Sequence, residues 1–172
     1  MKGDQIISEN DASTLNRVVE ELDYSMTELR RIARNMMPEA LVKFGLKDAL
    51  EDYCGHIREV SGMEVHFQAY GMQARLPQQV ELIFFRLVQE LLNNILRHAA
   101  ATEAMVQLLR DGNRLNLTVE DNGRGFDPAL LEKAPGIGWL NIRSRVKYLN
   151  GQLELHSLPG KGTSVNIECT LP

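Results

Sequence analysis

The distribution of glycine and proline constrains the fold of this chain more than any other feature. Neither residue occurs between positions 4 and 37, although the 172 residues include 13 glycines and 6 prolines. Both residues interrupt helices, so their absence favours one unbroken helix that ends at Pro38. Beyond Pro38 they recur at short intervals, as in shorter elements joined by turns.

Apolar residues repeat every seven positions in this first segment. One series is Leu15, Leu22, Leu29 and Met36, and a second is Val18 and Ile32 with Ser25 between them. A seven-residue apolar repeat is typical of helices that pack against partner helices. We therefore expect a helix over 8–36, about eight turns long. Packing of this helix against the same helix of a second chain would form a homodimer. A long surface helix lying on its own domain is the alternative.

The rest of the chain predicts an α+β domain. Apolar periodicity predicts helices over 46–61, 77–99 and 139–149, and strands over 63–70, 103–109, 114–120, 151–157 and 163–170. Asp111-Gly112-Asn113 is a good hairpin turn between two of these strands. Helices covering one face of a largely antiparallel sheet fit this order best.

Composition narrows the class of protein. A net charge of −4, with 44% hydrophobic and 24% charged residues, is ordinary for a globular protein and excludes disordered, collagen-like and disulfide-scaffold chains. Mild acidity argues against nucleic acid or an anionic membrane as an obligatory partner. With no bilayer-spanning apolar run and no secretory signal, we expect a cytoplasmic location. Cys54 and Cys169 are expected to be reduced thiols. A zinc site is not expected, because Cys54-Gly55-His56 has no second pair of ligands at a usable spacing.

Glu90 and Asn94 form the first candidate site. They lie four residues apart on the predicted 77–99 helix, so both side chains point to the same side. A carboxylate beside a carboxamide suits Mg²⁺, or a general base next to a metal ligand. Taken alone, a Glu/Asn pair at this spacing more commonly belongs to the solvent-exposed face of a helix.

A second candidate is the run Asp121-Asn-Gly123-Arg-Gly125-Phe, which directly follows a predicted strand. Its glycines allow positive φ angles or close approach of the backbone to a ligand. The carboxylate of Asp121 could accept a hydrogen bond from an exocyclic amino group such as that of adenine. An ordinary Asp-Asn-Gly turn is the alternative.

Two further glycine motifs come later. Gly136-Ile-Gly138 precedes a helix whose free N–H groups would suit phosphate, although Asn141 stands where the dinucleotide fingerprint needs its third glycine. Residues 160–163 read Gly-Lys-Gly-Thr. A phosphate-binding Walker loop is excluded there because Leu155 replaces the required glycine and a strand follows. By itself this run reads as a hairpin turn.

The order and spacing of these motifs resemble the ATP-binding domain of bacterial sensor histidine kinases, in the wider group shared with gyrase and Hsp90. Residues 90–99 resemble its N box, 121–126 its G1 box, 136–141 its G2 box and 160–163 its G3 box. The resemblance covers about 46–172. Residues 29–50 are similar to the second helix of the dimerisation region and its link, as in the nitrate-sensor branch.

The resemblance implies a Bergerat-type α/β sandwich over 41–172, with a mixed sheet covered on one face by helices. Residues 1–40 would be the dimerisation helix and linker. By similarity, Asn94 ligates the Mg²⁺ that bridges the ATP phosphates, Glu90 is the acid/base residue, and Asp121 binds adenine with support from Thr163. The nucleotide pocket and its lid over 127–135 would be completed by Gly123, Gly125, Gly136, Gly138, Asn141 and Gly162.

The acceptor histidine departs from the family pattern. It is expected on the first dimerisation helix, whereas the histidines here are His56, His66, His98 and His156. We therefore expect the catalytic part of a histidine kinase that binds Mg-ATP but does not label itself. The larger protein to which it belongs would be a membrane-bound receptor. The partners of the catalytic part would be the phosphoacceptor helix of the parent kinase and a response regulator.

Two alternatives stay open. One is a non-catalytic nucleotide-binding module that regulates a partner, although the presence of Glu90 argues against it. The other is a serine kinase of the anti-sigma type, although the predicted first helix argues against that.

Overall fold

The computed structural model describes residues 18–19, 22 and 39–171. Chain contacts divide the protein into two units, 1–38 and 39–172. The predicted helix over 8–36 lies outside the described residues except at Val18, Val19 and Leu22, which are helical and have exposed side chains. Its pairing with partner helices therefore stays a prediction.

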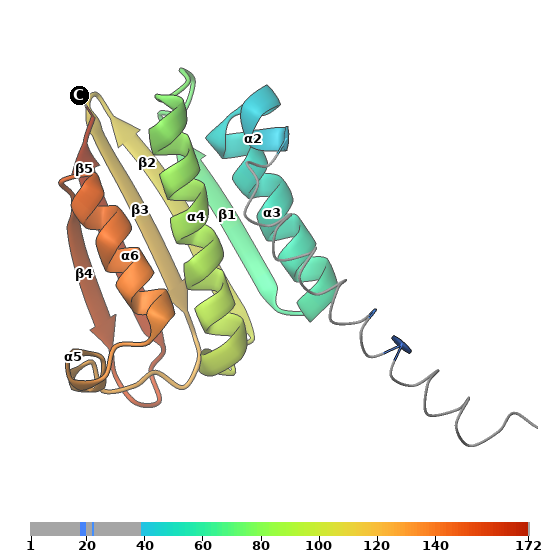
Figure 1. The fold of residues 1–172 in the computed structure, drawn as a ribbon, viewed down its shortest axis with the longest axis vertical. Coiled ribbons are helices and arrows are strands. Elements are labelled where there is room, and N and C mark those ends of the chain that lie inside the picture. The colour runs from blue at the N-terminus through green and yellow to red at the C-terminus, as the bar shows by residue number, and fades with distance from the viewer. Residues whose placement is uncertain (1–17, 20–21, 23–38, 172) are drawn as a thin grey trace, which may run out of the picture. The chain divides into compact units, whose positions relative to one another are not determined.

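A five-stranded mixed sheet forms one layer of the second unit (Figure 1). β1 pairs with β2 in parallel, and the other three strand pairs are antiparallel. Every predicted strand is present to within two residues. In the spatial order of the sheet the strands are β1 (Glu64–Tyr70), β2 (Glu103–Asp111), β3 (Arg114–Asp121), β5 (Thr163–Thr170) and β4 (Gln152–Ser157).

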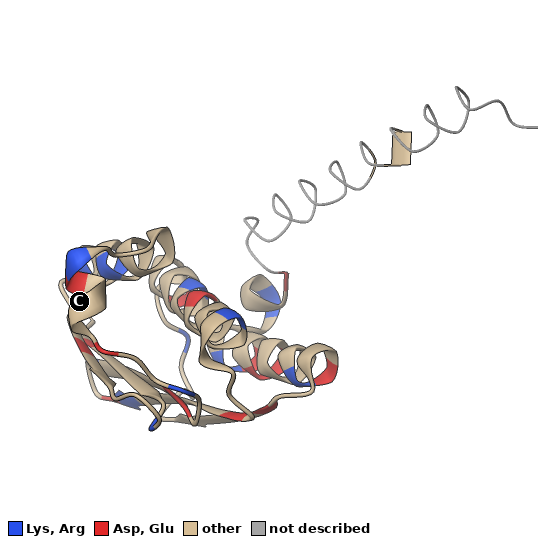
Figure 2. Ribbon diagram, turned by 90° about the horizontal axis from the view of Figure 1, so that it is seen from below, with Lys and Arg blue, Asp and Glu red and all other residues tan. Residues whose placement is uncertain are grey.

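The helices gather on one face of this sheet (Figure 2). The long ones are α3 (Leu46–Ser61), α4 (Gln78–Asn94) and α6 (Ile137–Tyr148), and the short ones are α2 (Glu39–Phe44) and α5 (Ala129–Lys133). The predicted 77–99 helix has the right extent, but it changes from α-helix to the π-helix η1 (Ile95–Ala99). The sequence did not predict α2 and α5, because elements of five or six residues are too short to show a periodicity.

Alternation along the strands separates the core from the outer face of the sheet. The side chains of Leu108 and Leu117 point to the helices and are fully buried. On the opposite face the amide of Asn116 donates to Asn166 Oδ1 at 3.1 Å, and Asn166 donates to Thr118 Oγ1 at 3.1 Å. One apolar and one polar face is what a sheet with helices on one side requires, and the predicted α+β class is confirmed.

The two cysteines are buried free thiols on different elements, Cys54 on α3 and Cys169 on β5. Burial raises the pKa of both thiols, that of Cys54 to about 12. Among the residues described, no helix combines the length and apolar character needed to cross a bilayer.

Candidate functional site

A cavity of about 410 Å³ lies where the C-terminal end of α4, the first turn of α6 and the ends of β3 and β5 meet. It brings together side chains that are far apart in the sequence. Seven of the ten predicted site residues line it, namely Glu90, Asn94, Asp121, Gly125, Gly136, Gly138 and Thr163. Gly123, Asn141 and Gly162 do not.

The walls between these polar groups are apolar. They come from the inward face of the sheet and from α4 and η1, and they are Leu91, Ile95, Val119, Leu155 and Val165. An apolar cavity with a few fixed polar groups is the usual form of a small-molecule site. A flat aromatic base fits such walls, because its faces need apolar contacts and its edge needs hydrogen bonds.

Glu90 and Asn94 lie about one turn apart near the end of α4. Gly138, in the first turn of α6, packs directly against both. A Cβ added to Gly138 would overlap Glu90 Oε1 and lie 3.4 Å from Asn94 Oδ1. The two side-chain oxygens therefore converge on one stretch of backbone that only glycine allows. Two residues earlier, Gly136 has open space around its Cβ position.

This pair of oxygens fits Mg²⁺. Magnesium accepts oxygen ligands and is commonly held by one or two protein side chains together with substrate phosphates. Of the two, Asn94 Oδ1 could hold such an ion, and the Glu90 carboxylate beside it could act as a base. Within the described part of the chain, no group of three or more His, Cys, Asp or Glu side chains could hold a metal ion.

The π-helix η1 brings Arg97 and His98 to the cavity, where both line the wall. It also presents the Ala99 carbonyl, which accepts a hydrogen bond from the N–H of Arg124 at 2.8 Å. A Cβ on Gly123 would overlap that carbonyl oxygen. Gly123 is therefore required by the close approach of the 121–126 loop to η1, and it does not line the cavity.

Asp121 ends β3, and its carboxyl group is half buried in the cavity wall. Its Oδ1 accepts a hydrogen bond from the N–H of Gly123 at 2.8 Å. Burial raises the pKa of the Asp121 carboxyl above its usual range, while hydrogen bonds from the N–H groups of Gly123 and Thr163 act in the opposite direction. The result is an acceptor held in a fixed orientation by the backbone.

Ser157 joins the 121–126 loop to the turn between β4 and β5, although none of the predicted motifs contains it. Its hydroxyl accepts from the N–H of Phe126 at 2.9 Å, donates to the Gly162 carbonyl at 3.1 Å and lies 2.9 Å from Thr163 Oγ1. Gly162 has a φ of 78°, and a Cβ there would overlap the Asp121 carbonyl oxygen. A polar residue at an inward-facing position of β4 was the available signal.

The remaining predicted residue, Asn141, is exposed on α6 and lies outside the cavity wall. In contrast, Trp139 lines the wall although it was not among the predicted site residues of the 136–141 motif. It also lines a neighbouring cavity of about 680 Å³ between α5, α6 and β4. Since the chain has a single tryptophan, its fluorescence reports directly on this site.

Comparisons with known proteins agree with this geometry. The chain is similar to the sensor histidine kinase MctS of Rhizobium johnstonii, with 35% identity over 148 residues, covering 85% of this chain and 32% of that protein. It is also similar to the signal transduction histidine-protein kinase/phosphatase DegS of Brevibacillus brevis, with 36% identity over 144 residues, covering 83% and 37% respectively. The chain thus spans about a third of the length of the curated relatives it matches. Neither name mentions nitrate, and the nitrate-sensor branch stays a prediction.

Among solved structures, the histidine kinase domain of the blue-light activated histidine kinase of Erythrobacter litoralis is similar, with 30% identity and a TM-score of 0.60 over 71% of this chain and 59% of that one. The family model for "Histidine kinase-, DNA gyrase B-, and HSP90-like ATPase" matches residues 79–172, more than half of the chain. The predicted family is confirmed: the chain belongs to the histidine kinase-, DNA gyrase B- and HSP90-like ATPases.

Proposed function

We propose that residues 41–172 bind Mg-ATP and act as the catalytic domain of a two-component sensor histidine kinase. The convergence of Glu90 and Asn94 on Gly138, in one cavity with Asp121, is the observation that carries this proposal. Residues 1–40 would form the second helix of the dimerisation region and the linker. α2 spans the boundary between these two parts.

The chemistry follows from what each side chain can do. The Asp121 carboxylate accepts a hydrogen bond from the adenine amino group, and Thr163 supports it. Asn94 holds Mg²⁺, which neutralises phosphate charge when bound. Glu90 accepts the proton that the acceptor imidazole loses as its nitrogen bonds to the γ-phosphorus and the bond to the β,γ-bridging oxygen breaks. Fixed positions for these groups are what phosphoryl transfer requires most.

The partners follow from the same proposal. The acceptor histidine would come from the first dimerisation helix of the parent kinase, since no histidine occurs in residues 1–38 of this chain. Residues 8–36 would form a homodimer with partner helices. The phosphoryl group would pass on to a response regulator, and the parent protein would be a membrane-bound receptor with this part in the cytoplasm. The names of the relatives, a sensor histidine kinase and a signal transduction histidine-protein kinase/phosphatase, support the kinase part of this assignment.

Metal-dependent nucleotide binding is the first test. Titration with ATP, followed by Trp139 fluorescence with and without Mg²⁺, should show tighter binding when the metal is present. Asn94→Ala should weaken binding in Mg²⁺ by about tenfold or more, because a ligand to the metal is lost. Asn93→Ala is the matched control, because Asn93 is outside the cavity wall. Equal effects of the two variants would remove Asn94 from the metal site.

Phosphoryl transfer is the second test. With γ-labelled ATP, the chain alone should carry no acid-labile phosphate, while an added fragment bearing the acceptor helix of the parent kinase should become labelled. Glu90→Gln should abolish labelling and keep nucleotide affinity. Stoichiometric phosphohistidine on this chain would contradict the proposal, and binding without transfer to the fragment would favour a regulatory nucleotide-binding module.

A further inference from the structure

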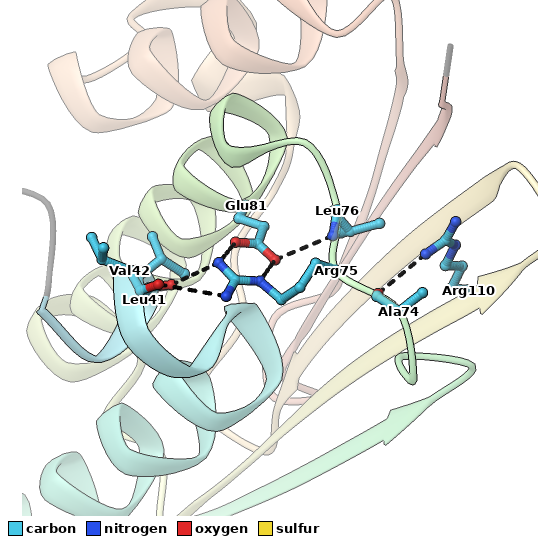
Figure 3. Close-up of polar contacts among 7 residues, drawn as sticks. All are labelled: Leu41, Val42, Ala74, Arg75, Leu76, Glu81 and Arg110. Carbon is cyan, nitrogen blue, oxygen red and sulfur yellow. Dashed lines mark hydrogen bonds and ion pairs between the residues drawn. The ribbon is translucent and has the colours of Figure 1, made fainter.

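A charged cluster outside the cavity ties α2 to the first turn of α4 (Figure 3). Its centre is Glu81 of α4, whose side chain is only 1% exposed. Arg75 donates to both carboxylate oxygens, from Nε to Oε1 at 2.9 Å and from Nη2 to Oε2 at 2.7 Å. The N–H of Leu76 adds a third hydrogen bond to Oε1 at 3.2 Å. A buried carboxylate needs such a complete set of partners, because an unpaired charge in the interior is costly.

The same guanidinium group also contacts α2. Its Nη2 donates to the Leu41 carbonyl at 3.1 Å and its Nη1 to the Val42 carbonyl at 3.5 Å. Carbonyl groups near a helix C-terminus attract cations. Gly45, between α2 and α3, allows the contact, because a Cβ there would lie 2.9 Å from Arg75 Cδ and Nε. One side chain thus bridges the end of α2 and the start of α4.

α2 buries few side chains of its own against the neighbouring helices α3 and α4. It has six residues, of which Leu41 alone is buried, while Val42 and Phe44 are 49% and 62% exposed. A helix this short is not stable by itself in water. Its position therefore depends on the burial of Leu41 and on the Arg75–Glu81 pair.

The Arg75–Glu81 pair connects α2, which follows residues 1–38, with α4, which carries part of the proposed nucleotide site. Residues 1–38 join the described domain at Glu39, the first residue of α2. At the other end, α4 continues from Glu81 to Glu90 and Asn94, about 14 and 20 Å farther along its axis. The buried residues of α4 extend over most of its length, so it moves as one body.

We propose that Arg75 and Glu81 are positioning residues that couple α2 to the Glu90/Asn94 end of the nucleotide site through α4. The inference rests on the proposed function, because it concerns the Mg-ATP site. The coupling has two states. In one the Arg75 guanidinium group is bound to the carbonyl groups of α2, and in the other it is released from them. Because coupling between two sites is reciprocal, nucleotide binding stabilises α2, and displacement of α2 changes the placement of Glu90.

Hydrogen exchange in the full chain, with Mg²⁺ and a non-hydrolysable ATP analogue as the probe, tests this coupling. In the wild type, the analogue should slow amide exchange both in residues 90–99 and in α2, the latter by about threefold or more. Arg75→Lys keeps a positive charge beside Glu81 and loses the planar fork that reaches the α2 carbonyls. It should abolish the response of α2, while residues 90–99 still respond and the affinity measured with Trp139 changes by less than about twofold.

Arg110→Lys is the matched control. Arg110 donates to the Ala74 carbonyl at 3.3 Å, next to Arg75 in the same loop (Figure 3), and has no bond to α2 in the described contacts. This variant should keep the α2 response. In the transfer assay, Arg75→Lys should lower kcat with little change in the KM for ATP, and Arg110→Lys should change neither.

Three outcomes would overturn the inference. The α2 response could persist in Arg75→Lys, it could be lost equally in Arg110→Lys, or it could be absent in a wild type whose residues 90–99 do respond. If neither region responds and Trp139 fluorescence is unchanged, nucleotide binding itself is refuted, and the proposed function fails together with the coupling.

Discussion

At the scale of single residues, Gly138 decides how closely α6 approaches the two polar side chains of α4. A methyl group at this position would displace the Glu90 carboxylate. Gly138→Ala should therefore lower phosphoryl transfer by about tenfold or more, since a displaced general base loses part of its usual contribution of roughly 10²–10⁴. Gly55→Ala is the control, because Gly55 lies on α3 outside the cavity wall and a Cβ there has open space around it. Initial rates on the acceptor fragment measure both, and a slow Gly55→Ala variant would contradict this account.

Asp121 predicts a pH dependence of nucleotide binding. Its pKa is raised by burial, so the carboxylate becomes protonated at a higher pH than an ordinary aspartate. Since the charged form is the proposed acceptor for the adenine amino group, ATP affinity should fall as the pH decreases through this raised pKa. The effect of Asp121 on folding has the opposite sign: its contribution to stability is present at low pH and is lost as the pH rises through the pKa of the folded state.

Titrations of ATP and of inorganic triphosphate over a series of pH values separate this effect from protonation of the phosphates. The extra loss at low pH should occur with ATP alone. Asp121→Asn should weaken ATP binding by roughly ten- to a hundredfold, from the loss of a charge-assisted hydrogen bond, and remove the extra pH dependence. An unchanged pH profile in that variant would separate Asp121 from adenine binding.

The sequence predicted the residues of the site better than their individual contacts. Glu90, Asn94 and Asp121 stand in motifs whose spacing is informative. Ser157 was missed because its three partners come from loops that meet only in the folded chain. Asn141 was predicted from its position in a motif, and its side chain is exposed on α6.

At the scale of elements, α5 is the least anchored helix of the described domain. It has five residues and none is buried, and elements with few apolar contacts open at a low free-energy cost. Amides in the predicted lid over 127–135 should exchange rapidly in the free protein and about tenfold more slowly with Mg-ATP analogue bound. Mass spectrometry of exchange measures this, with the buried strand β2 as internal control. A lid that is equally protected in both states would contradict a role in covering the nucleotide.

Element types were predictable where a periodicity extends over many residues, and not where tertiary contacts decide. The strands and the three long helices follow from apolar spacing. The change to the π-helix η1 at Ile95 has no local signal, because the Ala99 carbonyl is positioned by its hydrogen bond with Arg124. α2 depends in the same way on Arg75, a residue more than thirty positions away.

At the scale of the whole molecule, the division of the chain into two units predicts separable properties. Residues 1–172 should sediment as a dimer, because Val18, Val19 and Leu22 expose apolar side chains in the predicted helix. A chain of residues 39–172 should be monomeric and bind Mg-ATP with an affinity within about twofold of the full chain. Analytical ultracentrifugation and Trp139 titration test the two parts. Monomeric 1–172 would refute pairing through 8–36.

The position of Trp139 between two cavities has a consequence for inhibitor chemistry. Leu131, Trp139 and Leu155 line both the proposed nucleotide cavity and the larger cavity beside it. A compound built from an adenine mimic would therefore contact these three side chains if it were extended into the larger cavity. Arg143, Lys147 and Glu132 line that larger cavity, so a substituent placed there meets charges of both signs. An inhibitor of this chain can therefore gain contacts beyond those of adenine by extension past Trp139.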